Sequence, residues 1–311
     1  TGRIDDSNDP SSYRVHQKVQ KINEDDLDKL SAGAVMIGYA CDEGVRRNKG
    51  RIGAADGPNA IRSAISNMAV HVSTPIYDLG NCLCLDDHME KTQEEYSKKV
   101  SHSLSTKHMV IGLGGGHDIA YATGTGIYNY LKTHDPKSRL GIINIDAHFD
   151  LRKPKVEGNS GTPFYQLSQD HPDNFNYLVL GIQPFANTPR LFKTAEDLDV
   201  QYILRDDIPM TLYGSQSDWL EEEIYKWMSD LDHIYLSIDL DCLDPHICPG
   251  VSAPCVNGFT LDEVNSILSI VAFSGKLRLV DIAELNPKYD IDSRTAKVAA
   301  FLVHQIISNM G

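Results

Sequence analysis

Short apolar runs rich in Val, Ile and Leu recur along the chain, with longer stretches of helical character between them. Eight of these runs are expected to be strands: residues 34–40, 75–80, 108–114, 140–146, 177–182, 201–205, 233–240 and 277–285. A strand that is apolar on both faces must be buried on both faces, which is typical of a parallel sheet covered by helices. The sequence therefore predicts an α/β fold.

Helices are expected between the strands, at residues 118–131, 217–229, 260–271 and 292–307. The third begins with Thr260 and carries Glu263 three residues later, a capping-box pattern that marks a helix N-terminus. No repeat or linker interrupts the pattern. Residues 33–311 are therefore expected to form a single domain, preceded by an N-terminal extension, residues 1–32, with a short helix.

Composition narrows the function. The formal net charge of -14 makes nucleic acid and anionic membranes unlikely partners. No apolar run reaches the roughly 18–20 residues that span a bilayer. The six cysteines lack zinc-ribbon spacing, so a cytoplasmic protein with free thiols is expected.

Acidic and histidine side chains follow four of the predicted strands. The segments are GLGGGHD with His117; NIDAHFD with Asp146, His148 and Asp150; SIDLDCLDP with Asp239 and Asp241; and AELNP with Glu284. Each segment alone also fits a helix cap or a solvated turn. Ligands of open parallel sheets bind beyond the carboxyl ends of the strands, so the four segments together predict one shared site.

The charges of this cluster suggest a metal centre. Four carboxylates among six candidate ligands would be neutralised by two divalent cations. Oxygen-rich ligation with some imidazole and no thiolate favours Mn²⁺, while Fe²⁺, Co²⁺, Ni²⁺ and Zn²⁺ remain alternatives. Two such ions would deprotonate a bridging water to hydroxide.

The four segments together resemble the signature motifs of the arginase and agmatinase superfamily, the ureohydrolases, over residues 33–311. The resemblance implies a three-layer α/β/α fold with an eight-stranded, mainly parallel sheet, a homo-oligomer (trimer or hexamer), and two Mn²⁺ ions that hydrolyse amidine C–N bonds. It assigns one metal to His117, Asp146, Asp150 and Asp239. It assigns the other metal to Asp146, His148, Asp239 and Asp241. It also assigns Glu284 to binding the planar nitrogen group of the substrate.

Other residues resemble the formimidoylglutamase branch of this family, which cleaves N-formimidoyl-L-glutamate to L-glutamate and formamide in histidine degradation. Ser160 stands where arginases and agmatinases carry a histidine, so the proton donor to the leaving amine is open, with Asp150 a candidate. The small dicarboxylate substrate needs cations, for which Arg152 and Arg47 are candidates. Ser160 and Asn187 are further candidate substrate-binding residues.

Three alternatives stay open: a ureohydrolase that releases urea from arginine, agmatine or a guanidino acid; a catalytically silent metal-binding relative; and, more weakly, a two-metal phosphoesterase. Cys242 is expected to be a small buried hydrophobe, with a close approach to Cys41 as an alternative, because each thiol lies near a strand end.

Overall fold

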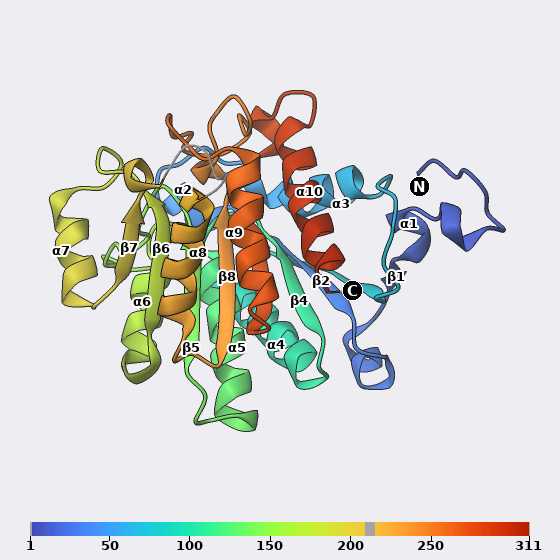
Figure 1. Cartoon of the computed structure of the whole chain (residues 1–311), viewed down its shortest axis with the longest axis horizontal. Coiled ribbons are helices and arrows are strands. Elements are labelled where there is room, and N and C mark those ends of the chain that lie inside the picture. The colour runs from blue at the N-terminus through green and yellow to red at the C-terminus, as the bar shows by residue number, and fades with distance from the viewer. Residues whose placement is uncertain (1, 209–214, 311) are drawn as a thin grey trace.

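The computed structural model describes residues 2–208 and 215–310. Within these ranges the core is one sheet of nine parallel strands, in the order β1-β3-β2-β4-β9-β8-β5-β6-β7 (Figure 1). The strands are β1 (Gln20–Lys21), β2 (Ala34–Ala40), β3 (Ile76–Leu83), β4 (Met109–Leu113), β5 (Leu140–Ile145), β6 (Asn176–Ile182), β7 (Gln201–Leu204), β8 (His233–Asp239) and β9 (Leu277–Ala283).

The predicted α/β class is confirmed, and each of the eight expected strands is present. The ninth strand, β1, was not predicted. It has only two residues, both polar and exposed, so no apolar run marks it, and it joins the sheet by pairing with β3. The same N-terminal segment contains a short helix, α1 (Val15–Lys18), and buries Leu27 completely.

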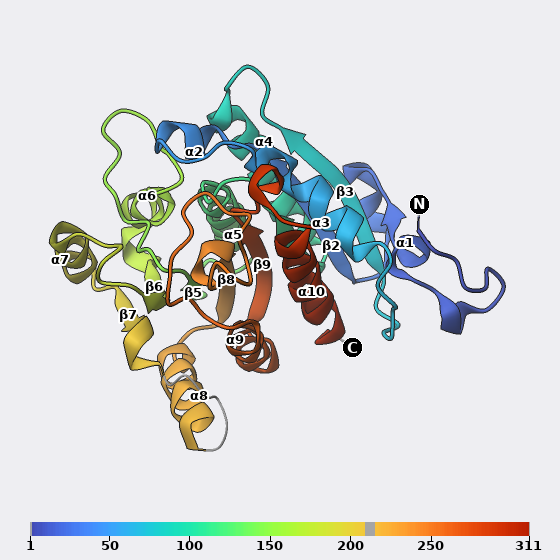
Figure 2. The ribbon, with the colours of Figure 1, turned by 90° about the horizontal axis from the view of Figure 1, so that it is seen from above.

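Helices cover both faces of the sheet (Figure 2). The helices after α1 are α2 (Glu43–Arg47), α3 (Gly57–Ile65), α4 (Met89–Ser105), α5 (Ile119–His134), α6 (Pro163–Asp170), α7 (Pro189–Asp197), α8 (Ser215–Met228), α9 (Leu261–Phe273) and α10 (Arg294–Ser308). The four expected helices correspond to α5, α8, α9 and α10. No described helix is long and apolar enough to cross a membrane.

Strand alternation divides the interior into two hydrophobic cores. Along β2, Ala34 and Met36 belong to the core that includes α3, α8, α9 and α10, whereas Val35 and Ile37 belong to the core that includes α4, α5, α6 and α7. Successive side chains of a strand point to opposite faces, so one apolar run supplies both cores. This packing holds the central strands rigidly, and their carboxyl ends therefore have fixed positions.

The capping box predicted at the start of α9 is present. The Thr260 hydroxyl accepts a hydrogen bond from the Glu263 backbone N–H at 3.3 Å, and the Glu263 carboxylate accepts one from the Thr260 backbone N–H at 2.7 Å. Glu263 also forms a buried ion pair with Arg205 at 3.1 Å.

Candidate metal centre

The four acidic and histidine segments follow β4, β9, β8 and β5, which are neighbours in the middle of the sheet. Because these strands are parallel, their carboxyl ends lie at the same edge, and the segments meet there. Two groups of side chains at this edge have ligand atoms close enough together to hold a metal ion.

The first group is His117, Asp146, Asp150 and Asp239. The imidazole Nδ1 of His117 lies 2.9 Å from Asp150 Oδ2, 3.0 Å from Asp239 Oδ2 and 3.3 Å from Asp146 Oδ2. His117 is 1% exposed, and its Nδ1 makes no well-oriented hydrogen bond to any described residue. A ring nitrogen aimed among three carboxylate oxygens is in the position of a metal ligand.

The second group is Asp146, His148 and Asp241. The Nδ1 of His148 lies 3.3 Å from Asp241 Oδ2 and 3.4 Å from Asp146 Oδ1. Asp146 thus offers one oxygen to each group. The family resemblance also placed Asp239 in this group, but here Asp239 Oδ1 accepts the backbone N–H of Asp241 at 2.8 Å.

The electrostatics of the cluster favour a bound cation. Burial, together with the carboxylates of Asp241 and Asp146, raises the pKa of Asp239 well above its usual range. Burial alone would lower the pKa of His117, but the carboxylates of Asp239, Asp146 and Asp150 raise it well above its usual range. The cluster therefore holds an excess of negative charge that attracts protons, and divalent cations could replace those protons. The donor set of carboxylate oxygens and imidazole nitrogens fits such ions.

Glu284 lies beside the cluster and is almost completely buried. Its Oε1 accepts the backbone N–H of His117 at 2.8 Å, whereas its Oε2 has no hydrogen-bond partner among the described residues. The backbone of Glu284 is left-handed, with φ at 69°, and so is that of Asp150, with φ at 50°. Such backbone conformations are uncommon for residues other than glycine, and they cluster at functional sites.

A cavity of about 320 Å³ opens above these side chains. Its floor includes His117, His148, Asp150, Asp239, Asp241 and Glu284, and its rim includes Asn48, Lys49, Arg51, Arg152, Ser160 and Ser252. Asn48 connects two of the rim residues, because its side chain accepts a hydrogen bond from Arg152 at 2.7 Å and donates one to Ser160 at 3.1 Å. The sequence reasoning missed Asn48, although it lies within the basic segment RRNKGR.

The structure places Arg47 and Asn187, the other two candidate substrate-binding residues, outside this cavity. The guanidinium of Arg47 pairs with Glu43 and Glu90 and donates to the Gly158 carbonyl at 3.2 Å. Arg47 therefore anchors the segment that leads to Ser160. Asn187 is buried and bonds to backbone groups of Ala147, Phe149 and Gln183. It holds the segment after β5 in shape.

The expected burial of Cys242 is confirmed, whereas the alternative of a close approach to Cys41 is wrong. Cys41 belongs to the core on the α4 and α5 face and interacts with Cys84, whereas Cys242 belongs to the core on the opposite face, close to Cys248. All six cysteines lie in the described ranges, and all are free thiols. Closeness to a strand end did not reveal which side of the sheet each thiol would occupy.

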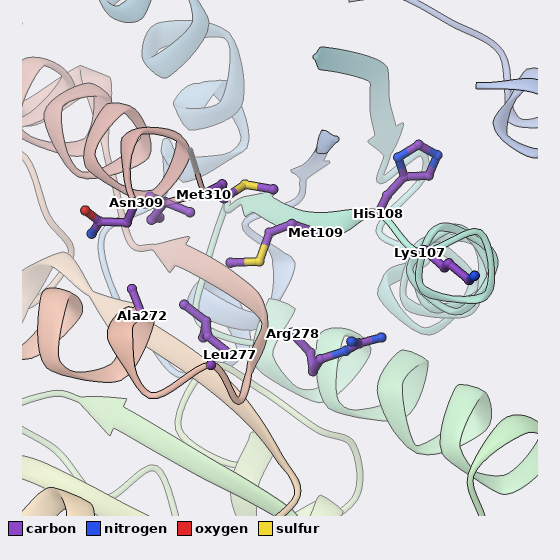
Figure 3. Close-up of a pocket in the computed structure, with 10 residues that line it drawn as sticks. Lys107, His108, Met109, Ala272, Leu277, Arg278, Asn309 and Met310 are labelled. Atoms are coloured by element: carbon purple, nitrogen blue, oxygen red, sulfur yellow. The ribbon is translucent and has the colours of Figure 1, made fainter. Parts of the chain in front are cut away.

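Another cavity, of about 290 Å³, lies at the opposite end of the central strands (Figure 3). Met109 and Leu277, the first residues of β4 and β9, line it with Lys107, Arg278 and Asn309. Its described lining has no carboxylate, so it lacks the ligands that make the first cavity a metal centre.

Comparison with known proteins identifies the family. The Arginase family profile matches residues 32–308, and the chain belongs to the arginase family. A formimidoylglutamase from Aeromonas hydrophila is 39% identical over 314 residues, covering 98% of this chain and 96% of that protein.

Solved structures share the fold. The formimidoylglutamase from Bacillus subtilis superposes with a TM-score of 0.85 at 22% identity, covering 97% of this chain and 93% of that one. The formiminoglutamase from Trypanosoma cruzi with Mn²⁺₂ gives a TM-score of 0.79 at 22% identity, covering 94% and 99%.

Proposed function

We propose that this chain is a formimidoylglutamase that uses two Mn²⁺ ions. It hydrolyses the amidine C–N bond of N-formimidoyl-L-glutamate and releases L-glutamate and formamide. The observation that carries the proposal is a single cavity with carboxylate and imidazole ligands on its floor and cations on its rim. The similarity to the Aeromonas protein extends over almost the whole chain and supports the same activity. The Mn²⁺ pair of the Trypanosoma cruzi structure supports the choice of metal.

The rim suits a substrate with two carboxylates. The Arg152 guanidinium makes a hydrogen bond to the Asn48 side chain and to no other described residue, and the Lys49 ammonium has no partner among the described residues. Arg51 donates hydrogen bonds to backbone carbonyls of Val251 and Ser252, and its guanidinium is already fixed in place. Arg152 and Lys49 are thus left to bind the substrate carboxylates, and a planar guanidinium does so with two parallel hydrogen bonds.

The floor suits the amidine end of the substrate. The unpartnered Oε2 of Glu284 accepts a hydrogen bond from an N–H of the amidine. This bond places the amidine carbon over the metal cluster. The chemistry that a pair of divalent ions supplies in such a site is activation of water and stabilisation of negative charge. Asp150, which faces the cavity, takes a proton from the water that attacks the amidine carbon, and it gives this proton to the glutamate nitrogen as the C–N bond breaks.

Product analysis tests the proposal. Protein loaded with Mn²⁺ under reductant would be assayed in parallel on N-formimidoyl-L-glutamate, arginine, agmatine and guanidinobutyrate, with chelated protein as the control. We expect formamide and glutamate from the first substrate and no urea from the others. Urea from any of the others would refute the substrate assignment. Absence of turnover with two metals bound would refute the proposed activity.

A further inference from the structure

A row of paired positions, three of them polar, crosses the central strands beneath the metal centre. In the strand register Gly112 pairs with Asp281, Asp281 with Ser237, and Ser237 with Asn144. Ser237, Asp281 and Asn144 are completely buried. Buried polar groups in the middle of an apolar sheet destabilise the fold unless they are hydrogen-bonded, so their retention needs a reason.

The bonds in this row lead to the first metal group. The Ser237 hydroxyl donates to Asp281 Oδ1 at 2.7 Å, and the Tyr235 hydroxyl donates to Asp281 Oδ2 at 2.6 Å. Ser237 Oγ also lies 2.9 Å from Nε2 of His117. At the end of the row, the Asn144 amide donates to Asp146 Oδ2 at 3.0 Å.

The direction of these bonds constrains the histidine. A hydroxyl has a single proton, and Ser237 gives its proton to Asp281. Ser237 Oγ must then accept from His117, which places a proton on Nε2. A neutral imidazole carries one proton, so its lone pair is left on Nδ1, the nitrogen that faces the carboxylate oxygens of the metal group.

We infer that Ser237 and Asp281 are positioning residues that fix the ring orientation and the tautomer of His117 and so prepare Nδ1 to bind a metal. Asp281 acts on His117 indirectly, through its hydrogen bond to Ser237. No basic side chain pairs with Asp281 in the described part of the chain, so the Ser237 and Tyr235 hydroxyls stabilise its buried charge by donating to its two oxygens. Histidine ligands elsewhere are oriented by acceptors on their second nitrogen. This inference rests on the metal centre proposed above.

The variants Ser237→Ala and Tyr235→Phe form a matched pair. Each removes one hydroxyl bonded to Asp281, from positions two residues apart on β8, but only Ser237 contacts His117. Mn²⁺ binding by the full-length protein would be followed by electron paramagnetic resonance of free Mn²⁺, which needs no turnover. Ser237→Ala should weaken the binding of one of the two Mn²⁺ ions by about 10- to 100-fold and leave the affinity for the other unchanged. Tyr235→Phe should weaken that ion by less, and Ser237→Thr, which keeps the hydroxyl, should restore tight binding.

Thermal unfolding of the metal-free variants checks that they fold. If Ser237→Ala does not fold, Asp281→Asn takes its place, because it keeps the shape of the side chain and removes the charge. Its Mn²⁺ affinity is then compared with that of Tyr235→Phe and should fall further. Unchanged Mn²⁺ binding in Ser237→Ala, or equal weakening by both members of the pair, would overturn the inference and leave the proposed function intact. A wild-type protein that binds no Mn²⁺ would overturn the proposed function, and this inference with it.

Discussion

Glu284 and His117 are joined directly, since Glu284 Oε1 accepts the backbone N–H of His117 at 2.8 Å. The bond ties the loop after β4 to the end of β9, and the second carboxylate oxygen of Glu284 has no hydrogen-bond partner among the described residues. The residue proposed to orient the substrate is thereby fixed to the segment that supplies a metal ligand.

Glu284→Gln should lower kcat/KM by about 100- to 1,000-fold, because it removes a charged acceptor for the substrate while keeping the shape of the side chain. Steady-state kinetics on N-formimidoyl-L-glutamate would measure the loss. Mn²⁺ stoichiometry is the control and should remain at two. A variant with near-normal kcat/KM would show that Glu284 does not contact the substrate.

Arg152→Gln should raise KM by about 10- to 100-fold with little change in kcat, because one charge-assisted hydrogen bond to a substrate carboxylate is lost. The neighbouring Lys153→Gln is the matched control. It removes the same charge from an exposed residue that does not line this cavity, and its KM should change little. If both variants raise KM equally, general electrostatic attraction explains the effect.

Removal of the metal should lower the stability of the protein, because the carboxylates of the cluster then repel one another. Mn²⁺ should raise the melting temperature of the chelated protein, because an ion that binds only the folded state stabilises it. Asp239→Asn keeps an acceptor for the Asp241 backbone N–H but removes one of the crowded charges. This variant should therefore be at least as stable as the metal-free wild type, yet lose most of the Mn²⁺ response in differential scanning fluorimetry. A full response would remove Asp239 from the ligand set.

The ion pairs of Glu43 should make stability depend on pH. Hydrogen bonds from Arg46, partly opposed by burial and reinforced by Arg47, lower the pKa of Glu43 below its usual 4.5. A lowered pKa in the folded state stabilises the fold above pH 4.5, and this contribution is lost as the pH falls through the folded value. Urea denaturation should show Glu43→Gln to be less stable than wild type by about 1–3 kcal/mol at pH 7. The difference should shrink progressively below pH 4.5; a difference that is constant with pH would mean that charge is not its cause.

The thiols should differ in reactivity with Ellman's reagent. Cys84 is partly exposed, whereas the other five cysteines are buried. Burial raises the pKa of Cys82 to about 12, and it raises those of Cys41 and Cys248 further, so these thiols stay protonated at pH 8. About one thiol should react in the native protein and six in denaturant. Rapid reaction of several thiols in the native protein would contradict the burial described here.

The sequence by itself determined eight of the strands, four of the helices and the ligand types. Apolar runs on both strand faces require two cores. Polar residues at the carboxyl ends of buried strands, such as Asp146 directly after β5 and Asp239 at the end of β8, can only lie at the sheet edge. Those local patterns suffice because strand periodicity and parallel topology together fix which ends meet. The two-residue strand β1 was missed because it buries no side chain and depends on pairing with β3.

Only the tertiary structure decided how side chains from distant segments pair. From the sequence, Arg47 and Arg152 were equal candidates to bind a substrate carboxylate. In the structure Arg47 pairs with Glu90 and donates to the Gly158 carbonyl, whereas Arg152 lines the cavity. The partners of Ser237 come from β9 and from the loop after β4, at sequence separations of 44 and 120 residues. Hydrogen-bond and ion-pair partners depend on distances and directions in the packed fold, and no local periodicity encodes them.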